Sequence, residues 1–202
     1  MINILLVTQG LFHPSWRARK LLRKILEELE GFSFHTVNSM ESLPQDLENY
    51  AAMVIYVHHK KISENALDRF DTFVKTGGGV LGVHTATASF KQQLAYSEIM
   101  GGCFTGHGPI ERFEIQPLAE SAVFQDIPAF SVKDELYIHE LQPGITPHFV
   151  APYDGQEVPV VWTHPYGAGR VCVAVPGHFS RTLENKAYQK VLQQGLLWVS
   201  GR

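Results

Sequence analysis

Short apolar runs that alternate with amphipathic segments are the feature that most constrains what this chain can fold into. Residues 2–7, 52–57 and 80–83 are almost entirely apolar, and residues 32–37 form a further extended segment. Continuous apolar runs are typical of parallel strands, because helices cover such a sheet on both faces. The alternation therefore predicts an α/β fold with a doubly wound, mainly parallel sheet and right-handed crossovers.

The segments between these strands carry helix signals, which are apolar residues at helical spacing bounded by capping residues or glycines. We expect four helices: one between Ser15 as N-cap and Gly31 as stop, one from Ser63 to the glycines at 77–79, one from about Phe90, and one over 188–199.

The pattern changes after Gly101. A more polar strand is expected over residues 110–115, and proline-rich loops are expected to follow through Pro128, Pro143 and Pro147. Strands at 158–163 and 170–175 then flank the glycine-containing sequence at 166–169, which predicts a hairpin. No repeat or linker interrupts the chain, so we expect a single domain over residues 1–202.

Composition narrows the function classes. The 202 residues are 45% hydrophobic and 18% charged, as in an ordinary globular protein, and the net charge of -3 argues against a nucleic-acid partner. No apolar run is long enough to cross a bilayer, so no membrane association is expected. Two cysteines, Cys103 and Cys172, make no disulfide framework, which predicts a reducing, cytoplasmic location.

Histidines follow several of the expected strands. His13, His58 and His59, His84, and His178 each come shortly after a strand, and His107 lies between two glycines in an expected flexible loop. Ligands of open α/β sheets bind at the carboxyl ends of the parallel strands. We therefore expect chain-distant imidazoles to meet at one edge of the sheet, with the His107 loop folding over it.

His84 occupies the sharpest local motif. A strand, a turn with small residues and a helix are the elements of a nucleophile elbow, whose apex side chain projects over the end of the sheet. The apex here is His84, where an elbow enzyme carries Cys or Ser. Imidazole is a good base or metal ligand, so we expect His84 to point outward and to contribute chemistry, with little role in packing.

Six segments in this order resemble ThuA-like proteins, a family similar in fold to class I glutamine amidotransferases. They are Gly77–His84, Gly101–Phe104 with Gly106-His107, Asp134–Tyr137, Pro159–Trp162, Gly167–Val171 and Pro176–His178. The resemblance covers nearly the whole chain. It implies a flavodoxin-like, glutamine amidotransferase-like fold and a role in using trehalose or related disaccharides.

The resemblance also implies that glutaminase chemistry is lost. In amidotransferases, a histidine after a late strand partners the catalytic cysteine and is followed by proline and an acid. His178 stands in a similar place, but Phe179 and Ser180 follow it, and His84 replaces the nucleophile. We therefore expect no glutaminase activity.

The candidate site residues have three roles. His84, His178 and Glu135 are the catalytic candidates, with Glu135 as general base or as the group that orients a histidine. His107, His13, His58, Tyr137 and Trp162 are the candidates for substrate binding. Three imidazoles with an open position would also suit zinc or another divalent metal, and the candidates for that set are His84, His107 and His178. Alternatively, Glu135 serves a loop ion pair and the two aromatic residues belong to the core.

Two functions remain open at this point. One is an enzyme, a lyase, isomerase or hydrolase, that acts on a disaccharide or a keto-sugar, whose carbonyl group acidifies the neighbouring C–H. The alternative is a non-catalytic sugar-binding or regulatory subunit that keeps the amidotransferase-like fold. Either way the expected partner is a small sugar, and assembly into a homo-oligomer stays open.

Overall fold

The computed structural model of the protein describes residues 1–10, 15–118 and 121–202. The strands of this described part are β1 (Ile2–Gln9), β2 (Phe32–Val37), β3 (Ala52–Val57), β4 (Gly79–Val83), β5 (Gly102–Pro117), β6 (Phe130–Leu141), β7 (Thr146–Tyr153), β8 (Gln156–Tyr166) and β9 (Gly169–Ala174). Its α-helices are α1 (Ser15–Leu26), α2 (Glu64–Lys75), α3 (Leu94–Met100), α4 (Ser180–Leu183) and α5 (Lys186–Val199).

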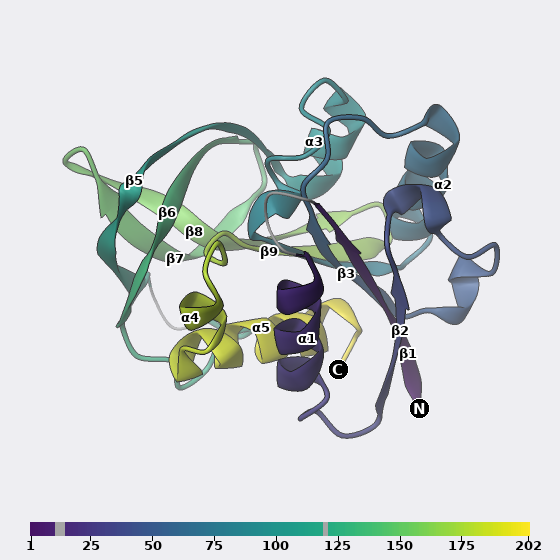
Figure 1. Cartoon of the computed structure of the whole chain (residues 1–202), viewed down its shortest axis with the longest axis horizontal. Coiled ribbons are helices and arrows are strands. Elements are labelled where there is room, and N and C mark those ends of the chain that lie inside the picture. Colours follow the sequence, from purple (N-terminus) through teal and green to yellow (C-terminus); the bar gives the residue numbers. More distant parts are fainter. Residues whose placement is uncertain (11–14, 119–120) are drawn as a thin grey trace.

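The strands form one sheet with two different halves, in the order β2-β1-β3-β4-β9-β8-β7-β5-β6. The strands at one end of this order, β2-β1-β3-β4-β9, pair in parallel. From β9 onward the pairing is antiparallel, and β5 and β6 form a long two-stranded ribbon (Figure 1). The protein therefore has an α/β fold with a mixed sheet, and the expectation of a mainly parallel sheet holds only for one half.

Helices cover both faces of the parallel half. Helices α1, α4 and α5 lie on one side and contact one another, and α2 and α3 lie together on the other side (Figure 1). Between these layers the strands are fully buried, and every residue of β3 and β4 is inaccessible or nearly so. This double coverage explains why the strands are continuously apolar.

Most of the expected elements of the parallel half are confirmed. The bounds of β2 and β3 match the predicted segments, and Ser63 caps α2 by accepting a hydrogen bond from the backbone N–H of Ala66. The predicted hairpin is also present, with Tyr166 opposite Gly169. Helix α1 ends at Leu26, before the predicted stop, and α3 begins four residues after Phe90.

The expected proline-rich loops after Gly101 are confirmed at Pro128 and Pro143, but the segment between and after them is not loop. Strands β6 and β7 occupy most of that segment, with Pro147 inside β7, and β5 begins at Gly102, well before the predicted strand. The inward positions of β6 alternate as Phe130, Val132, Asp134 and Leu136. The carboxylate in this series interrupts the apolar period of two that identifies a strand.

None of the helices in the described part of the chain is long and apolar enough to cross a lipid bilayer.

Candidate functional site

His84 stands at the carboxyl end of β4, where the elbow pattern placed it. Its backbone has a φ of 47°, in the left-handed region that residues with a Cβ seldom adopt, and it begins a single 3-10 turn, His84–Ala86. Backbone strain of this kind concentrates at functional sites. The local geometry therefore agrees with an elbow whose apex is a histidine.

The side chain of His84 is buried, contrary to the expectation that it points outward. Its exposed fraction is 0%, and its ring centroid lies 4.4 Å from that of Tyr137. Nδ1 of His84 lies 3.0 Å from the backbone oxygen of Val175, which can only accept, so Nδ1 carries a hydrogen. A neutral His84 therefore has its lone pair on Nε2.

His178 and Glu135 meet His84 from two other elements. His178 follows β9 and its ring centroid lies 5.6 Å from that of His84, with the ring planes 81° apart. Glu135 comes from β6, and its Oε2 lies 3.1 Å from Nδ1 of His178. One potential ligand atom from each of the three residues lies within 4.8 Å of the others. The side chains of His178 and Glu135 are 22% and 13% exposed, so these two members of the trio are reachable from solvent.

Asp134 is the site residue whose role sequence reasoning missed. This fully buried carboxylate accepts hydrogen bonds from the backbone N–H groups of Glu135, Gly177 and His178 and from the hydroxyl of Thr182. Burial raises its pKa, and the four donors offset part of that rise by favouring the charged form. Asp134 thereby ties the loop that carries His178 to the strand that carries Glu135.

Two tyrosines hold the other side of the same loop. The hydroxyl of Tyr56 donates to the backbone oxygen of Gly177 at 3.1 Å, and that of Tyr188 donates to the oxygen of Pro176. Burial raises the pKa of both phenols, so they remain protonated donors. His178 is therefore positioned by a hydrogen-bond network and not by a mobile loop.

Tyr137 forms a wall of the site. It is 4% exposed, and its ring packs against those of His84, Phe104 and His107 at centroid distances of 4.4, 4.6 and 5.8 Å. Burial raises its pKa, with smaller contributions from neighbouring charges and from a hydrogen bond to Glu135. This arrangement packs Tyr137 into the site, where little of its surface is left for a sugar to stack on.

The remaining predicted residues lie elsewhere. His107 is exposed on β5, opposite Tyr137, and is neither in a flexible loop nor in the trio. Trp162 is fully buried and donates to the backbone oxygen of Met100, so the idea that it stacks on a sugar is wrong. His58 follows β3; burial lowers its pKa, and it is near enough to Glu135 for that carboxylate to offset part of the lowering. His13 falls outside the described residues.

With this geometry in view, comparison with known proteins decides the family. Residues 3–199 match the family model ThuA, described as trehalose utilisation. The chain belongs to the ThuA family. Among curated proteins none matches the sequence.

Solved structures show the same fold at low sequence identity. A protein described as ThuA-like, from Parabacteroides merdae, superposes with a TM-score of 0.86 at 21% identity and covers 98% of this chain and 90% of its own. A second, from Bacteroides uniformis, gives 0.81 at 17% identity, covering 98% and 91%. A cytoplasmic protein from Salmonella typhimurium gives 0.67 at 14% identity, covering 98% and 99%.

Neither cysteine of this ThuA-family chain is placed for thiol chemistry at the elbow. Cys172 is fully buried within β9, where burial raises the pKa of its thiol. Cys103 lies on β5 next to Phe104, so its side chain projects to the opposite face of the strand from the ring that packs on Tyr137. Imidazole and carboxylate are therefore the reactive groups of the trio.

The trio also has the donor set of a divalent metal site. Two imidazoles and one carboxylate are the ligands of several catalytic zinc sites. In this ThuA-family chain the set is His84, Glu135 and His178, so Glu135 takes the third place, for which His107 is the candidate from sequence.

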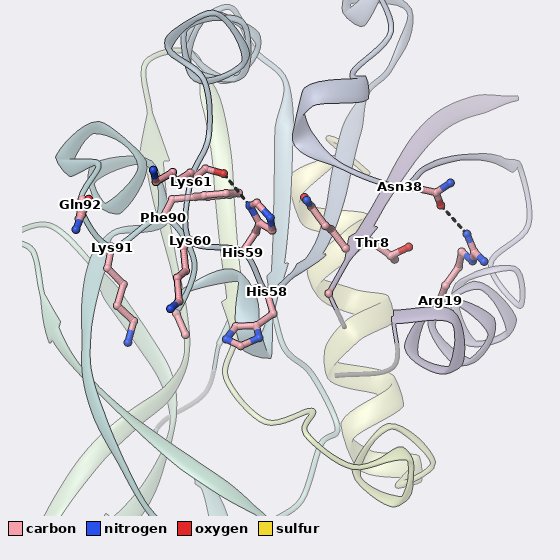
Figure 2. A pocket seen from close by; sticks show the side chains of 13 residues that line it. Thr8, Arg19, Asn38, His58, His59, Lys60, Lys61, Phe90, Lys91 and Gln92 are labelled. Atoms are coloured by element: carbon pink, nitrogen blue, oxygen red, sulfur yellow. Dashed lines mark hydrogen bonds between the residues drawn. The ribbon is translucent and has the colours of Figure 1, made fainter. Parts of the chain in front are cut away.

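A large cavity lies beside the trio and is lined by none of its three members. Its volume is about 980 Å³, and it opens at the carboxyl ends of β1 and β3 (Figure 2). The side chains that define it are Thr8, Gln9, Arg19, Asn38, His58, His59, Lys60, Lys61, Phe90, Lys91 and Gln92. This volume is at the upper end of the range of ligand pockets, about 300–1,000 Å³.

Proposed function

We propose that this ThuA-family protein is a sugar-processing enzyme of trehalose or disaccharide catabolism, with His84, Glu135 and His178 as its catalytic groups. The observation that carries the proposal is the contact between His178 and Glu135 directly beside His84. Titratable groups that converge at the carboxyl edge of a parallel sheet are strong candidates for an active site. A member of a trehalose-utilisation family has sugars as its natural substrate class.

The proposed chemistry starts from the His178–Glu135 pair. A carboxylate can only accept, so Nδ1 of a neutral His178 carries the hydrogen and Nε2 is the basic nitrogen. With a keto-sugar, Nε2 removes the proton from the carbon next to the carbonyl group, and Glu135 stabilises the imidazolium that forms. Where that carbon carries a hydroxyl group, return of the proton to the former carbonyl carbon, with transfer of the hydroxyl proton to the enolate oxygen, completes an isomerisation. Where the carbon beyond it carries a leaving oxygen, transfer of the proton to that oxygen as its C–O bond breaks completes an elimination.

The same three residues would hold a divalent metal if one binds. The ion would supply a Lewis acid that polarises the carbonyl oxygen of the sugar. Metal analysis of protein purified without chelator, followed by comparison of wild type with His178→Ala, tests this part of the proposal.

We further propose a flavodoxin-like, doubly wound description of the parallel half and a cytoplasmic location. Five parallel strands with helices on both faces support the first. The Salmonella typhimurium protein of similar fold, which is described as cytoplasmic, supports the second.

The test is a turnover screen. Purified protein is incubated with trehalose, other disaccharides and their keto derivatives, and the products are followed by NMR. We expect one of these sugars to be consumed by wild type and not by His178→Ala, while the surface variant Glu111→Gln on β5 keeps full activity. A sugar that raises the melting temperature but is never consumed would contradict the enzyme and support the sugar-binding alternative.

A further inference from the structure

Among the described residues, the cavity beside the trio is lined by several basic side chains and by no acidic one. Arg19, Lys60, Lys61 and Lys91 contribute permanent positive charges, and His58 and His59 add imidazoles. The whole chain carries a net charge of -3, so this concentration of cations runs against its overall charge. Cavities lined by one sign of charge attract ligands of the opposite sign.

Three of these basic groups are close to one another. Burial lowers the pKa of His58, and Lys91 and Lys60 lower it further, which shows that both ammonium groups are within electrostatic reach of the imidazole. In Figure 2 the side chains of Lys60 and Lys91 extend in the same direction, near His58. In the described part of the chain, no carboxylate lies within salt-bridge distance of Lys60, Lys61 or Lys91.

This cluster of basic side chains, formed by Lys60, Lys91 and His58, lies next to the trio. The charge of Glu135 raises the pKa of His58, so the imidazole in the cavity lies within electrostatic reach of the carboxylate of the site. Nζ of Lys91 lies 4.0 Å from the ring centroid of Phe104, and that ring lies 4.6 Å from Tyr137, the wall of the site. Lys91 is therefore connected to Tyr137, the wall of the site, through the single ring of Phe104.

We propose that the cavity binds an anionic group of the substrate through Lys60, Lys91 and His58. The substrate is then an acidic sugar derivative that carries a phosphate or a carboxylate, whose reacting carbon lies at the trio. This assignment of substrate class rests on the proposed function, but binding itself can be measured without turnover. The ammonium groups of Lys60 and Lys91, which have no carboxylate within salt-bridge distance in the described part of the chain, provide the charge-assisted hydrogen bonds that such an anion requires.

The experiment is titration calorimetry at low ionic strength with three probes: glucose 6-phosphate, glucuronate and glucose. We expect at least one acidic probe to bind about tenfold or more tightly than glucose, and its affinity to fall as salt is added. Removing both lysines, in Lys60→Gln with Lys91→Gln, should weaken that probe about tenfold to 100-fold and leave glucose unchanged.

A matched control carries the same change in net charge. Lys24→Gln with Lys190→Gln removes two exposed lysines outside the cavity and should leave all three affinities unchanged. Preference for glucose 6-phosphate identifies a phosphate, and preference for glucuronate a carboxylate. The inference is overturned if no acidic probe is preferred, or if both double variants behave alike while remaining folded by circular dichroism.

The two proposals fail in different ways. If the acidic probes bind through the lysines but no sugar is ever consumed, the proposed enzymatic function fails and the anion site stands. If sugars are consumed without any preference for an acidic probe, the anion site fails and the enzymatic function stands.

Discussion

Gly177 and His84 approach each other so closely that a Cβ atom on Gly177 would lie 2.9 Å from the Cβ of His84. Gly177 also has a φ of 148°, which L side chains rarely adopt. The glycine therefore allows the loop after β9 to lie directly on the elbow after β4. This contact places the rings of His84 and His178 together.

Gly177→Ala should separate the two imidazoles. The added methyl group clashes with His84 and strains the backbone. We therefore expect a loss of about 1–3 kcal/mol in the free energy of unfolding, and a loss of activity even under conditions where the variant stays folded. Urea unfolding measures the first and the turnover assay the second. Gly144, also at positive φ but with open space around its Cβ position, gives the control Gly144→Ala, which should lose stability but keep activity.

His84→Ala should affect folding as well as activity. The buried ring packs on Tyr137 and donates to Val175, so we expect a loss of about 2–4 kcal/mol in the free energy of unfolding. His84→Asn should cost less, because asparagine tolerates a positive φ. Both variants should be inactive, and a His84→Ala protein as stable as wild type would contradict the observed packing.

Asp134→Asn should weaken the site through its positioning network. Each carboxylate oxygen accepts two hydrogen bonds, so either orientation of the amide points its NH₂ at donors. We expect a loss of about 2–4 kcal/mol in unfolding free energy, measured in urea, and reduced turnover. The exposed Asp68→Asn on α2 should change neither quantity.

Glu135→Gln separates two roles for the carboxylate. If Glu135 orients His178, turnover should fall about 10- to 100-fold with the fold intact. A fall of about 1,000-fold or more would instead assign Glu135 as the general base. Steady-state kinetics beside the Glu111→Gln control distinguishes these results, and unchanged turnover would remove Glu135 from the site.

Acid should destabilise the protein through two buried histidines outside the trio. Burial lowers the pKa of His148 to about 4 and that of His139 to about 3. The unfolded chain, with histidine pKa values near 6.5, then binds more protons than the folded one, so stability falls as pH drops from about 6.5 to 4. Urea unfolding across this range should show a shallower pH dependence in His148→Gln, while the exposed His35→Gln should follow wild type.

The sequence predicts the parallel half of the fold better than the antiparallel half. Strands such as β3 are recognisable because their apolar runs depend only on burial between two helix layers. Strand β6 escapes recognition because Asp134 occupies an inward position and Tyr137 faces a site instead of a uniform core.

The unrecognised strand β6 explains the wrong expectations at the site. The position of His84 follows from its local turn, which sequence reveals. Its burial depends on Tyr137 of β6, a long-range neighbour whose strand the sequence pattern does not reveal. The exposed place of His107 likewise follows from the pairing of β5 with β6.

The β5–β6 ribbon is separated from β9 by β8 and β7 in the sheet, yet it supplies Glu135. His84 and His178 come instead from adjacent parallel strands. A partial opening that lifts the ribbon would disperse the trio while the parallel sheet stays intact. We therefore expect heating to inactivate the protein before it melts, and inactivation of this kind should reverse on cooling.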